Sequence, residues 1–445
     1  MKFIRKILTV ILIILIANFP VVLILVRAKL IFPMILVGGG FYFIYSIFPG
    51  RISGVVSKQM SIPIQILYGG CELVSVAVVC SVVSIAINVW AFFYVAMELT
   101  FFNVLFGIGV LALMIMQGMT RIIVFSKQVS VMKKILILFL CWVPIVNIIF
   151  VRQMCKKARL ECEVETHIRT LDAAREENQI CRTKYPVFMV HGIFFRDWQY
   201  FNYWGRVPVE LVRNGAVVHY GNQQSSLSVL ESAQELSEQI RQIVNDTGCE
   251  KVNIIAHSKG GLDSRYAISC LGCAPFVASL TTINTPHMGC VWVDHVLTKV
   301  PKAILKHVEK RYNQVFQKLG DKQPDFLGGI RDLTVESATL FNQNVPNKEG
   351  ILYQSVMSQM RKPGSGKFPL NMSYRVIRKV QGSANDGLVP VESARWGRDL
   401  GILRASGKRG ISHGDMIDLN RENIPGFNVR EFYVSVIAGL KQNGL

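Results

Sequence analysis

The sequence predicts an α/β domain with a mostly parallel sheet, preceded by an all-α transmembrane region. The chain has 445 residues, too many for one ordinary domain. Residues 1–151 carry 11 Lys and Arg but only Glu72 and Glu98 as acids, whereas the remainder carries 38 basic against 28 acidic residues. From Tyr185 onward, short apolar runs alternate with segments of helical periodicity, the pattern of a parallel sheet covered by helices.

The first third contains apolar segments long enough to cross a bilayer. Ile7–Val26 runs 20 residues without a charge. A signal peptide is the alternative interpretation, but the run is long and no small-residue cleavage site follows it. The second segment is separated from the first only by Arg27-Ala-Lys29, so the two are expected to form a hairpin, and Pro144 is expected to kink the fifth. The five predicted spans are 7–26, 30–48, about 71–96, 100–119 and 135–151.

Charge indicates a multi-pass protein of the cell membrane and leaves its orientation open. The basic N-terminus favours a cytoplasmic start, and five spans would then place the following domain outside. Arg152, Lys156, Lys157 and Arg159 directly after the last span favour the opposite. The net charge of +19 suits anionic lipid headgroups, and no compact basic and aromatic module indicates a nucleic-acid partner. We therefore expect a transmembrane region over 1–151, a charged linker over 152–184 and a globular domain over 185–445.

The ten cysteines do not form a disulfide or metal framework. They are scattered without a repeated spacing. Cys270-Leu-Gly-Cys273 is a single CxxC motif, and a zinc or redox role would need a second cysteine pair or a fitting fold. We expect buried small residues or free thiols. Glu72, near the end of a predicted span, is interpreted as protonated or interfacial rather than functional.

Val252–Tyr266 is the stretch with the clearest chemistry. Val252, Ile254 and Ile255 predict a short buried strand, Ser258 follows it, and Gly260 and Gly261 open a helix. A serine hydroxyl is a weak nucleophile that must stand clear of its backbone, reach a base and have free N–H groups nearby. A tight strand-to-helix turn supplies these conditions. The same pattern, Ala-x-Ser-x-Gly, also occurs in strand–helix turns for steric reasons only.

Further strands and helices are expected on both sides of this turn. His-Gly after the first strand leaves room for a loop whose backbone N–H can point into a site, and Asn-Thr-Pro-His-Met-Gly ends the strand that follows the serine. The expected strands are 187–190, 217–220, 252–255, 277–283 and 374–380, and the expected helices are 200–214 and 229–244.

Three motifs together resemble the bacterial triacylglycerol lipase family of the α/β-hydrolase fold. They are Val190-His-Gly192, Ala256-His-Ser-Lys-Gly-Gly261 and Thr285-Pro-His-Met-Gly289, in the family's order. The resemblance covers about 185–440 and leaves the membrane region outside it. It implies a serine hydrolase whose triad follows the order Ser, acid, His.

With Ser258 as nucleophile, the resemblance implies His413 as base and Asp386 as acid. His413 is the histidine that lies after every plausible acid, although an ordinary surface loop residue is the alternative. Asp386 lies in Asn-Asp-Gly, where it could instead merely close a turn, and Asp399 and Glu392 are the fallback acids. The oxyanion donors would be the backbone N–H groups of Ile193 and Lys259.

Three details depart from the simplest form of this family. The Lys259 side chain stands where Met or Gln is commoner; it could favour anionic substrates or point to solvent. Residues 290–320 carry apolar positions on one helical face among lysines, which fits either a lid or a surface helix packed on the sheet. Asp415, two residues after His413, matches one calcium position of some relatives, but no second aspartate does, so no cofactor is expected.

The sequence thus predicts a membrane-anchored lipase or esterase that cleaves acyl esters of lipids through an acyl-serine intermediate. The same triad could serve an acyltransferase or a phospholipase. A non-catalytic membrane scaffold would have no need of Ser258, Asp386 and His413 together.

Overall fold

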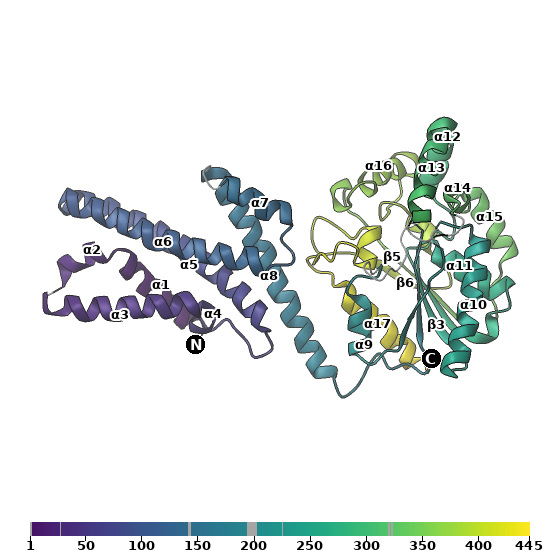
Figure 1. Cartoon of the computed structure of the whole chain (residues 1–445), viewed down its shortest axis with the longest axis horizontal. Helices are drawn as coiled ribbons and strands as arrows, with labels where there is room; N and C mark the ends of the chain where they lie inside the picture. The colour runs from purple at the N-terminus through teal and green to yellow at the C-terminus, as the bar shows by residue number, and fades with distance from the viewer. Residues whose placement is uncertain are drawn as a thin grey trace. The chain divides into compact units, whose positions relative to one another are not determined.

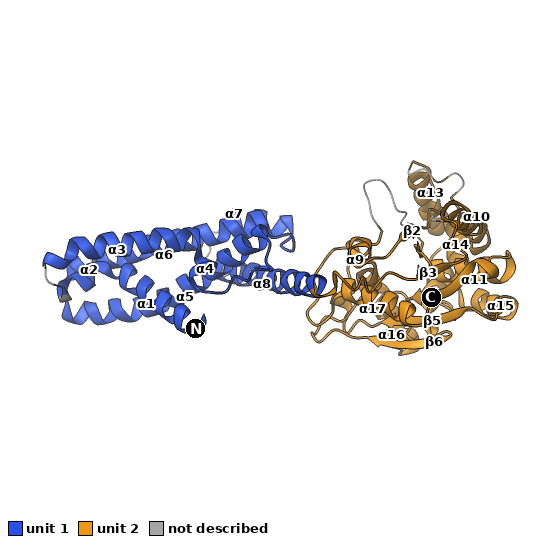
Figure 2. Cartoon of the chain, turned by 90° about the horizontal axis from the view of Figure 1, so that it is seen from below, with its two compact units in different colours: residues 1–173 blue, residues 174–445 orange. Residues whose placement is uncertain are grey.

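The computed structural model describes residues 2–26, 28–140, 144–193, 203–224, 226–318, 321 and 324–445. The chain divides into two compact units, Met1–Ala173 and Ala174–Leu445 (Figure 2).

The first unit is helical, and among its described residues three helices are long and apolar enough to cross a membrane. These stretches are Lys29–Ile47, Ile62–Tyr94 and Met97–Phe125. Many large apolar side chains on them are exposed, including Phe32, Val82 and Phe101. The helices of this unit are α1 (Lys2–Ala17), α2 (Phe19–Val22), α3 (Ala28–Ile47), α4 (Pro49–Ile52), α5 (Ile62–Tyr94), α6 (Met97–Phe125), α7 (Val131–Leu140) and α8 (Pro144–Arg175), with α8 crossing into the second unit.

The expected five spans are corrected at both ends of this region. The run 7–26 does not form one helix, because α1 ends at Ala17 and a short second helix starts at Phe19 with Pro20 in its first turn. The run 135–151 is divided between α7 and α8, with residues 141–143 outside the described part. Pro144, where a kink is expected, is the first residue of α8, and the residues before it lie outside the described part, so the kink stays a prediction. The third span begins at Ile62 rather than near Cys71.

The second unit is a parallel sheet between two layers of helices (Figure 1). The strand order is β2-β1-β3-β4-β5-β6, and every neighbouring pair is parallel. The strands are β1 (Val187–Val190), β2 (Val218–Tyr220), β3 (Val252–His257), β4 (Val277–Ile283), β5 (Leu352–Ser358) and β6 (Arg398–Leu403). The α-helices are α9 (Val207–Arg213), α10 (Val229–Thr247), α11 (Gly260–Cys270), α12 (Val291–Lys299), α13 (Lys302–Lys318), α14 (Phe326–Arg331), α15 (Val335–Asn344), α16 (Leu370–Gln381) and α17 (Val429–Gln442).

Each face of this sheet has its own apolar core, as the alternation of side chains along β1 illustrates. Val187 and Met189 pack in a cluster with residues of α9 and α17. Phe188 and Val190 pack on the other face with residues of α10 and α11. Burial on both faces explains why the inner strands are continuous apolar runs rather than alternating ones.

One expected strand is wrong. Residues 374–380 form part of α16, in which the two buried side chains, Ser373 and Ile377, are one helical turn apart. The strand that precedes this region is β5, whose buried Gln354 and Ser355 made it look polar. Of the helix expected over 200–214, residues 200–202 lie outside the described part, and α9 covers Val207–Arg213.

Candidate active site

Ser258 occupies a strained turn between β3 and α11. Its φ is +55°, a left-handed conformation that residues other than glycine seldom adopt. The backbone N–H of Ser258 donates to Ile283 O at 2.9 Å, which fixes the turn against the end of β4. The turn therefore presents the serine at the carboxyl end of a central strand, ahead of a helix N-terminus.

Two glycines are needed for steric reasons at this turn. A Cβ on Gly260 would lie 2.3 Å from His191 O, and a Cβ on Gly261 would lie 2.2 Å from Thr285 Oγ1. Both distances are far below van der Waals contact. The first turn of α11 thus packs directly on the backbone after β1 and on the loop after β4.

Asp386 and His413 form a buried hydrogen-bonded pair. His413 Nδ1 donates to Asp386 Oδ2 at 2.6 Å, and His413 N donates to Asp386 O at 2.9 Å. The other carboxylate oxygen, Oδ1, accepts from the N–H groups of Leu388 and Val389, both at 2.8 Å. Asp386 therefore both closes its turn and holds the imidazole.

The pair and the loop after β1 both lie close to the serine turn. The His413 ring centroid is 4.5 Å from that of His257, the residue before Ser258. A Cβ on Gly192 would lie 2.8 Å from Ser258 Cβ, so the loop that carries Ile193 passes directly beside the nucleophile. The structure thus gathers Ser258, Asp386, His413 and the backbone of Ile193 and Lys259 at one end of the sheet.

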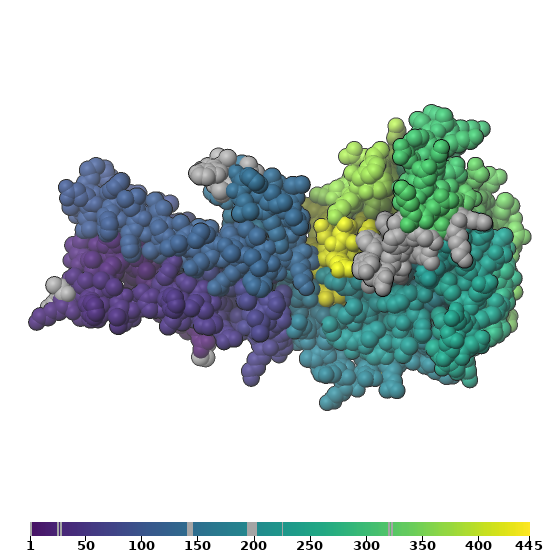
Figure 3. Space-filling model, viewed as in Figure 1, coloured from purple at the N-terminus to yellow at the C-terminus, as the bar shows by residue number. Residues whose placement is uncertain are grey.

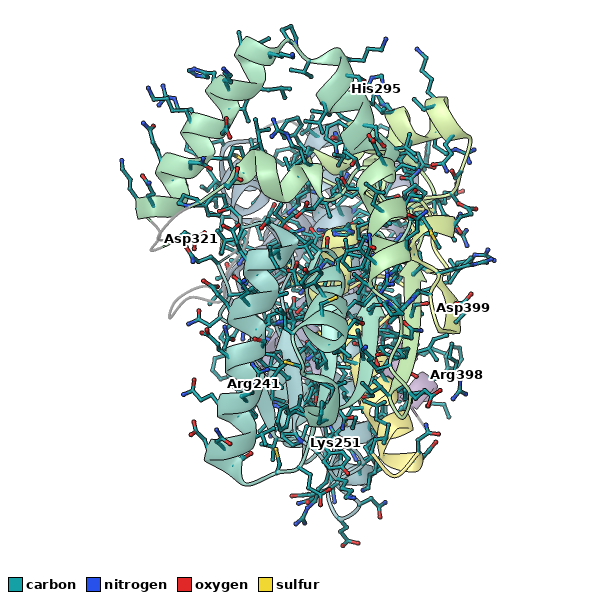
Figure 4. The ribbon with its side chains drawn as sticks, turned by 90° about the vertical axis from the view of Figure 1, so that its right-hand side faces the viewer. Arg241, Lys251, His295, Asp321, Arg398 and Asp399 are labelled. Atoms are coloured by element: carbon teal, nitrogen blue, oxygen red, sulfur yellow. The ribbon has the colours of Figure 1, made fainter. Side chains whose placement is uncertain are left out.

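The fallback acids lie elsewhere. Glu392 is exposed at the start of the 3-10 turn Glu392–Ala394, and Asp399 is 40% exposed on the edge strand β6, where it pairs with Arg395 at 3.3 Å. Figure 4 labels Asp399 and Arg398 at the side of the unit. Neither holds the imidazole of His413, whose Nδ1 is taken by Asp386.

Tyr203 is a residue of the site that the sequence analysis missed. Its hydroxyl accepts from Gly192 N at 3.0 Å and lies 2.7 Å from His257 Nδ1, so it joins the loop after β1 to the end of β3. Burial, with a smaller contribution from His413, lowers the pKa of His257 well below its usual value, so this ring is neutral. Tyr203 follows no strand and belongs to no motif, so the sequence offered no signal for it.

The Lys259 side chain neither points to solvent nor faces a substrate. It is buried, and Nζ donates to Asp263 Oδ1 at 2.7 Å, Ser232 Oγ at 2.9 Å and Ser228 O at 3.3 Å. These contacts use all three ammonium hydrogens. Burial raises the pKa of Asp263 to about 7, although Lys259 opposes the rise. The spacing of four residues on a helix could have predicted this pair.

The surroundings of Asp415 do not fit a calcium ion. Its Oδ2 accepts from Ser412 N and Ser412 Oγ, both at 2.7 Å, and its Oδ1 accepts from Arg409 Nη2 at 3.0 Å. Calcium needs six or more oxygen ligands. Here the Arg409 guanidinium occupies the position beside Asp415 that a metal ion would need. Among the described residues no cluster of three or more His, Cys, Asp or Glu side chains could hold a metal.

Within the predicted segment 290–320, the described residues form the helices α12 and α13. α12 ends at Lys299, Pro301 lies between the two helices, and α13 begins at Lys302. Only Val293 of α12 and Phe316 of α13 are buried within the described part of these helices, and Ile304 and Val315 are exposed. Most of the expected apolar face is thus only partly covered.

Comparison with known proteins relates this chain to lipases and to a thioesterase family. A family model described as palmitoyl protein thioesterase matches residues 186–325. A triacylglycerol lipase of Burkholderia plantarii is 34% identical over 188 residues, which is 39% of this chain and 52% of that protein. A triacylglycerol lipase of Vibrio cholerae is 29% identical over 238 residues, which is 49% of this chain and 76% of that protein. The second unit is a lipase- or esterase-like α/β-hydrolase.

The likeness covers only part of this chain and part of the curated relatives. The chain spans about half the length of the first curated relatives that it matches, 52% and 55%. Among solved structures, the mature lipase of Bacillus licheniformis is 19% identical over 57% of this chain and 92% of its own, with a TM-score of 0.43. The Staphylococcus hyicus lipase is 17% identical over 59% of this chain and 97% of its own, with a TM-score of 0.48.

Proposed function

We propose that this protein is a membrane-held serine hydrolase that cleaves carboxylic esters of lipids. The observation that carries the proposal is the buried Asp386–His413 pair, 2.6 Å between Oδ2 and Nδ1, beside a serine held at a φ of +55°. Turns that merely pack a strand on a helix require neither the strained serine nor the carboxylate-bound imidazole.

The proposed reaction follows from the position of each group. His413 takes the proton of Ser258 Oγ as the oxygen attacks the acyl carbonyl, and Asp386 stabilises the imidazolium that forms. The N–H groups of Ile193 and Lys259 stabilise the oxyanion. The imidazolium gives its proton to the leaving alcohol, and water then releases the acyl group from Ser258 by the same steps in reverse order.

Lipid esters are the proposed substrates because the chain carries both a lipase-like unit and helices that could span a bilayer. Stretches of 19, 33 and 29 residues have the required length and hydropathy. Such helices would keep the hydrolase at a membrane, where acyl esters are concentrated.

The test is hydrolysis of p-nitrophenyl esters of increasing acyl length by the full chain in detergent, with Ser258→Ala beside it. Ser269→Ala is the matched control, since its hydroxyl lies at the far end of α11, where it donates to Pro346 O. We expect activity in the wild type and the control and its loss in Ser258→Ala, together with loss of fluorophosphonate labelling. A wild type that neither hydrolyses esters with lipid present nor takes the label would refute the proposal.

Thioester hydrolysis is a second candidate, because the palmitoyl protein thioesterase model matches residues 186–325. An acyl-serine intermediate forms equally from an ester or a thioester. Comparing kcat/KM for p-nitrophenyl palmitate and palmitoyl-coenzyme A separates the two. A strong preference for the thioester would favour this second candidate.

A further inference from the structure

The segment that contains α16 has an unusual charge. Between Glu349 and Asp386 the chain has no acidic residue and six basic ones, all of them exposed. They are Arg361, Lys362, Lys367, Arg375, Arg378 and Lys379. Among the described residues, none of the six lies within ion-pair distance of a carboxylate. This segment therefore presents unneutralised positive charge to its surroundings.

Large apolar side chains accompany these charges. Phe368, just before α16, is 76% exposed, and Met372 in its first turn is 56% exposed. Met372, Arg375 and Lys379 are three and four residues apart, so they share the side of the helix opposite to the buried Ser373 and Ile377. A basic helix face flanked by exposed apolar side chains is typical of helices that lie at a lipid–water boundary.

α16 is attached directly to the candidate active site. Ser373 Oγ donates to the carbonyl of Gly387, the residue after Asp386. A Cβ on Gly387 would lie 2.9 Å from Leu370 Cβ, so the first turn of α16 packs on the turn that holds the acid. Any surface that binds α16 is thus brought to the catalytic end of the sheet.

The neighbouring helices carry the same sign of charge. α16 lies beside α12, and both are at the same end of the second unit (Figures 1 and 3). Residues 291–318, which form α12 and α13, contain six basic residues, Lys299, Lys302, Lys306, Lys310, Arg311 and Lys318, and two acidic ones, Asp294 and Glu309. α16 is therefore part of a wider positive end of the unit.

We propose that residues 361–381 form a docking surface for anionic lipid headgroups of a membrane. The basic side chains would contact headgroup phosphates, while Phe368 and Met372 enter the boundary with the acyl chains. A bilayer fits better than an acidic protein or a nucleic acid because the same chain contains helices that could span one. Docking would bring the Asp386 turn to the lipid surface, but the docking itself does not depend on ester hydrolysis.

The expected effect of charge removal can be stated as a fold-change. Each Lys or Arg near an anionic membrane surface contributes about 1 kcal/mol, or roughly fivefold in affinity. Neutralising Arg375, Arg378 and Lys379 together should thus weaken docking about 100-fold. Raising the ionic strength should weaken it too, since added salt shortens the Debye length.

The experiment is hydrogen exchange on the full chain reconstituted in vesicles. The vesicles consist of phosphatidylcholine alone or of phosphatidylcholine mixed with phosphatidylglycerol. The test variant is Arg375→Gln/Arg378→Gln/Lys379→Gln. The matched control, Arg182→Gln/Lys184→Gln/Lys251→Gln, removes the same formal charge just before β1 and β3, at the amino end of the sheet. Figure 4 shows Lys251 at the end of the unit opposite to His295 of α12.

We expect the amides of 367–381 to exchange more slowly in the anionic vesicles than in the neutral ones, in the wild type and in the control variant. The test variant should lose this difference, and high salt should remove it from the wild type. Equal exchange of 367–381 in both lipids, or equal slowing of peptides from β3 and α10, would overturn the proposal. A Ser258→Ala chain should give the wild-type pattern, which separates a failure of docking from a failure of the proposed catalysis.

Discussion

Replacing Lys259 by Met should destabilise the second unit strongly, even though methionine would fit the same space. Lys259 and Asp263 are 2% and 3% exposed, and 2.7 Å separates Nζ from Oδ1. The substitution leaves the Asp263 carboxylate, Ser232 Oγ and Ser228 O without their shared donor. Removing one partner of a buried ion pair costs about 3–5 kcal/mol, because the remaining charge is desolvated without compensation.

A second substitution tests this explanation. Asp263→Leu in the Lys259→Met background removes the orphaned carboxylate, and buried pairs replaced by apolar side chains of similar volume often lose little stability. We therefore expect the double variant to recover most of the free energy of unfolding. If the cost came from packing alone, the second substitution would add to the first instead of offsetting it.

The loss should also depend on pH. Burial raises the pKa of Asp263 from 3.8 to about 7, so the folded unit retains a proton that the unfolded chain releases between these values. The contribution of Asp263 to stability therefore falls as pH rises through this window. Without Lys259, which opposes the rise, the pKa of Asp263 would be higher still. The deficit of Lys259→Met should accordingly be larger at pH 8 than at pH 5.

The assay is urea unfolding of the purified full chain in detergent, with the folded fraction of the second unit read by a brief pulse of protease. Unfolding is compared at pH 5 and pH 8 for the wild type, both single variants and the double variant. A Lys259→Met deficit below about 1 kcal/mol at pH 8, within the range of an exposed ion pair, would refute the reasoning.

Two further predictions concern the site. Asp386→Asn should lower kcat by about 10³–10⁴, because the amide can present its N–H to Nδ1 and favour the wrong imidazole tautomer; Glu392→Gln is the control, and similar losses in both would remove Asp386 from its proposed role. Gly260→Ala should destabilise the unit by about 1–3 kcal/mol, because the added Cβ would lie 2.3 Å from His191 O. The control is Gly439→Ala in α17, which has open space around it and should stabilise the unit by up to about 1 kcal/mol. Urea unfolding measures both glycine variants, and a neutral Gly260→Ala would contradict the close packing of the turn.

The central strands could be predicted from sequence because burial on both faces leaves them continuously apolar. β1 and β4 have the predicted bounds, Val187–Val190 and Val277–Ile283. β5 could not be predicted in this way. Its buried Gln354 and Ser358 are each satisfied by a residue of β4 or the loop after it, with Gln354 Nε2 donating to Thr281 Oγ1 at 2.7 Å and Ser358 Oγ accepting from Asn284 Nδ2 at 2.8 Å. Such partners come from distant parts of the chain, so composition does not reveal them.

The local composition of the segment 374–380 favours a strand, although the segment forms a helix. Val376, Ile377 and Val380 are β-branched residues, which are enriched in strands. The apolar positions Leu370, Tyr374 and Ile377 are, however, four and three residues apart, which is the helical period. A window extended back to Pro369 would have included Leu370 and indicated the helix.

The first predicted span failed for a reason that hydropathy does not measure. Asn18 counts as one polar residue in an apolar run, but its side chain donates to Ser84 Oγ in α5 at 2.8 Å and accepts from Asn103 Nδ2 in α6 at 3.2 Å. Asn103 Oδ1 in turn accepts the backbone N–H of Val21 in α2 at 3.3 Å. A helix end buried among apolar helices must satisfy its backbone groups, and these amides supply the partners. A polar residue within an apolar run therefore raises the cost of crossing the bilayer and also marks a point where the helix can end. Whether the run 7–26 forms one span thus depends on the hydrogen-bond partners that α5 and α6 provide for Asn18.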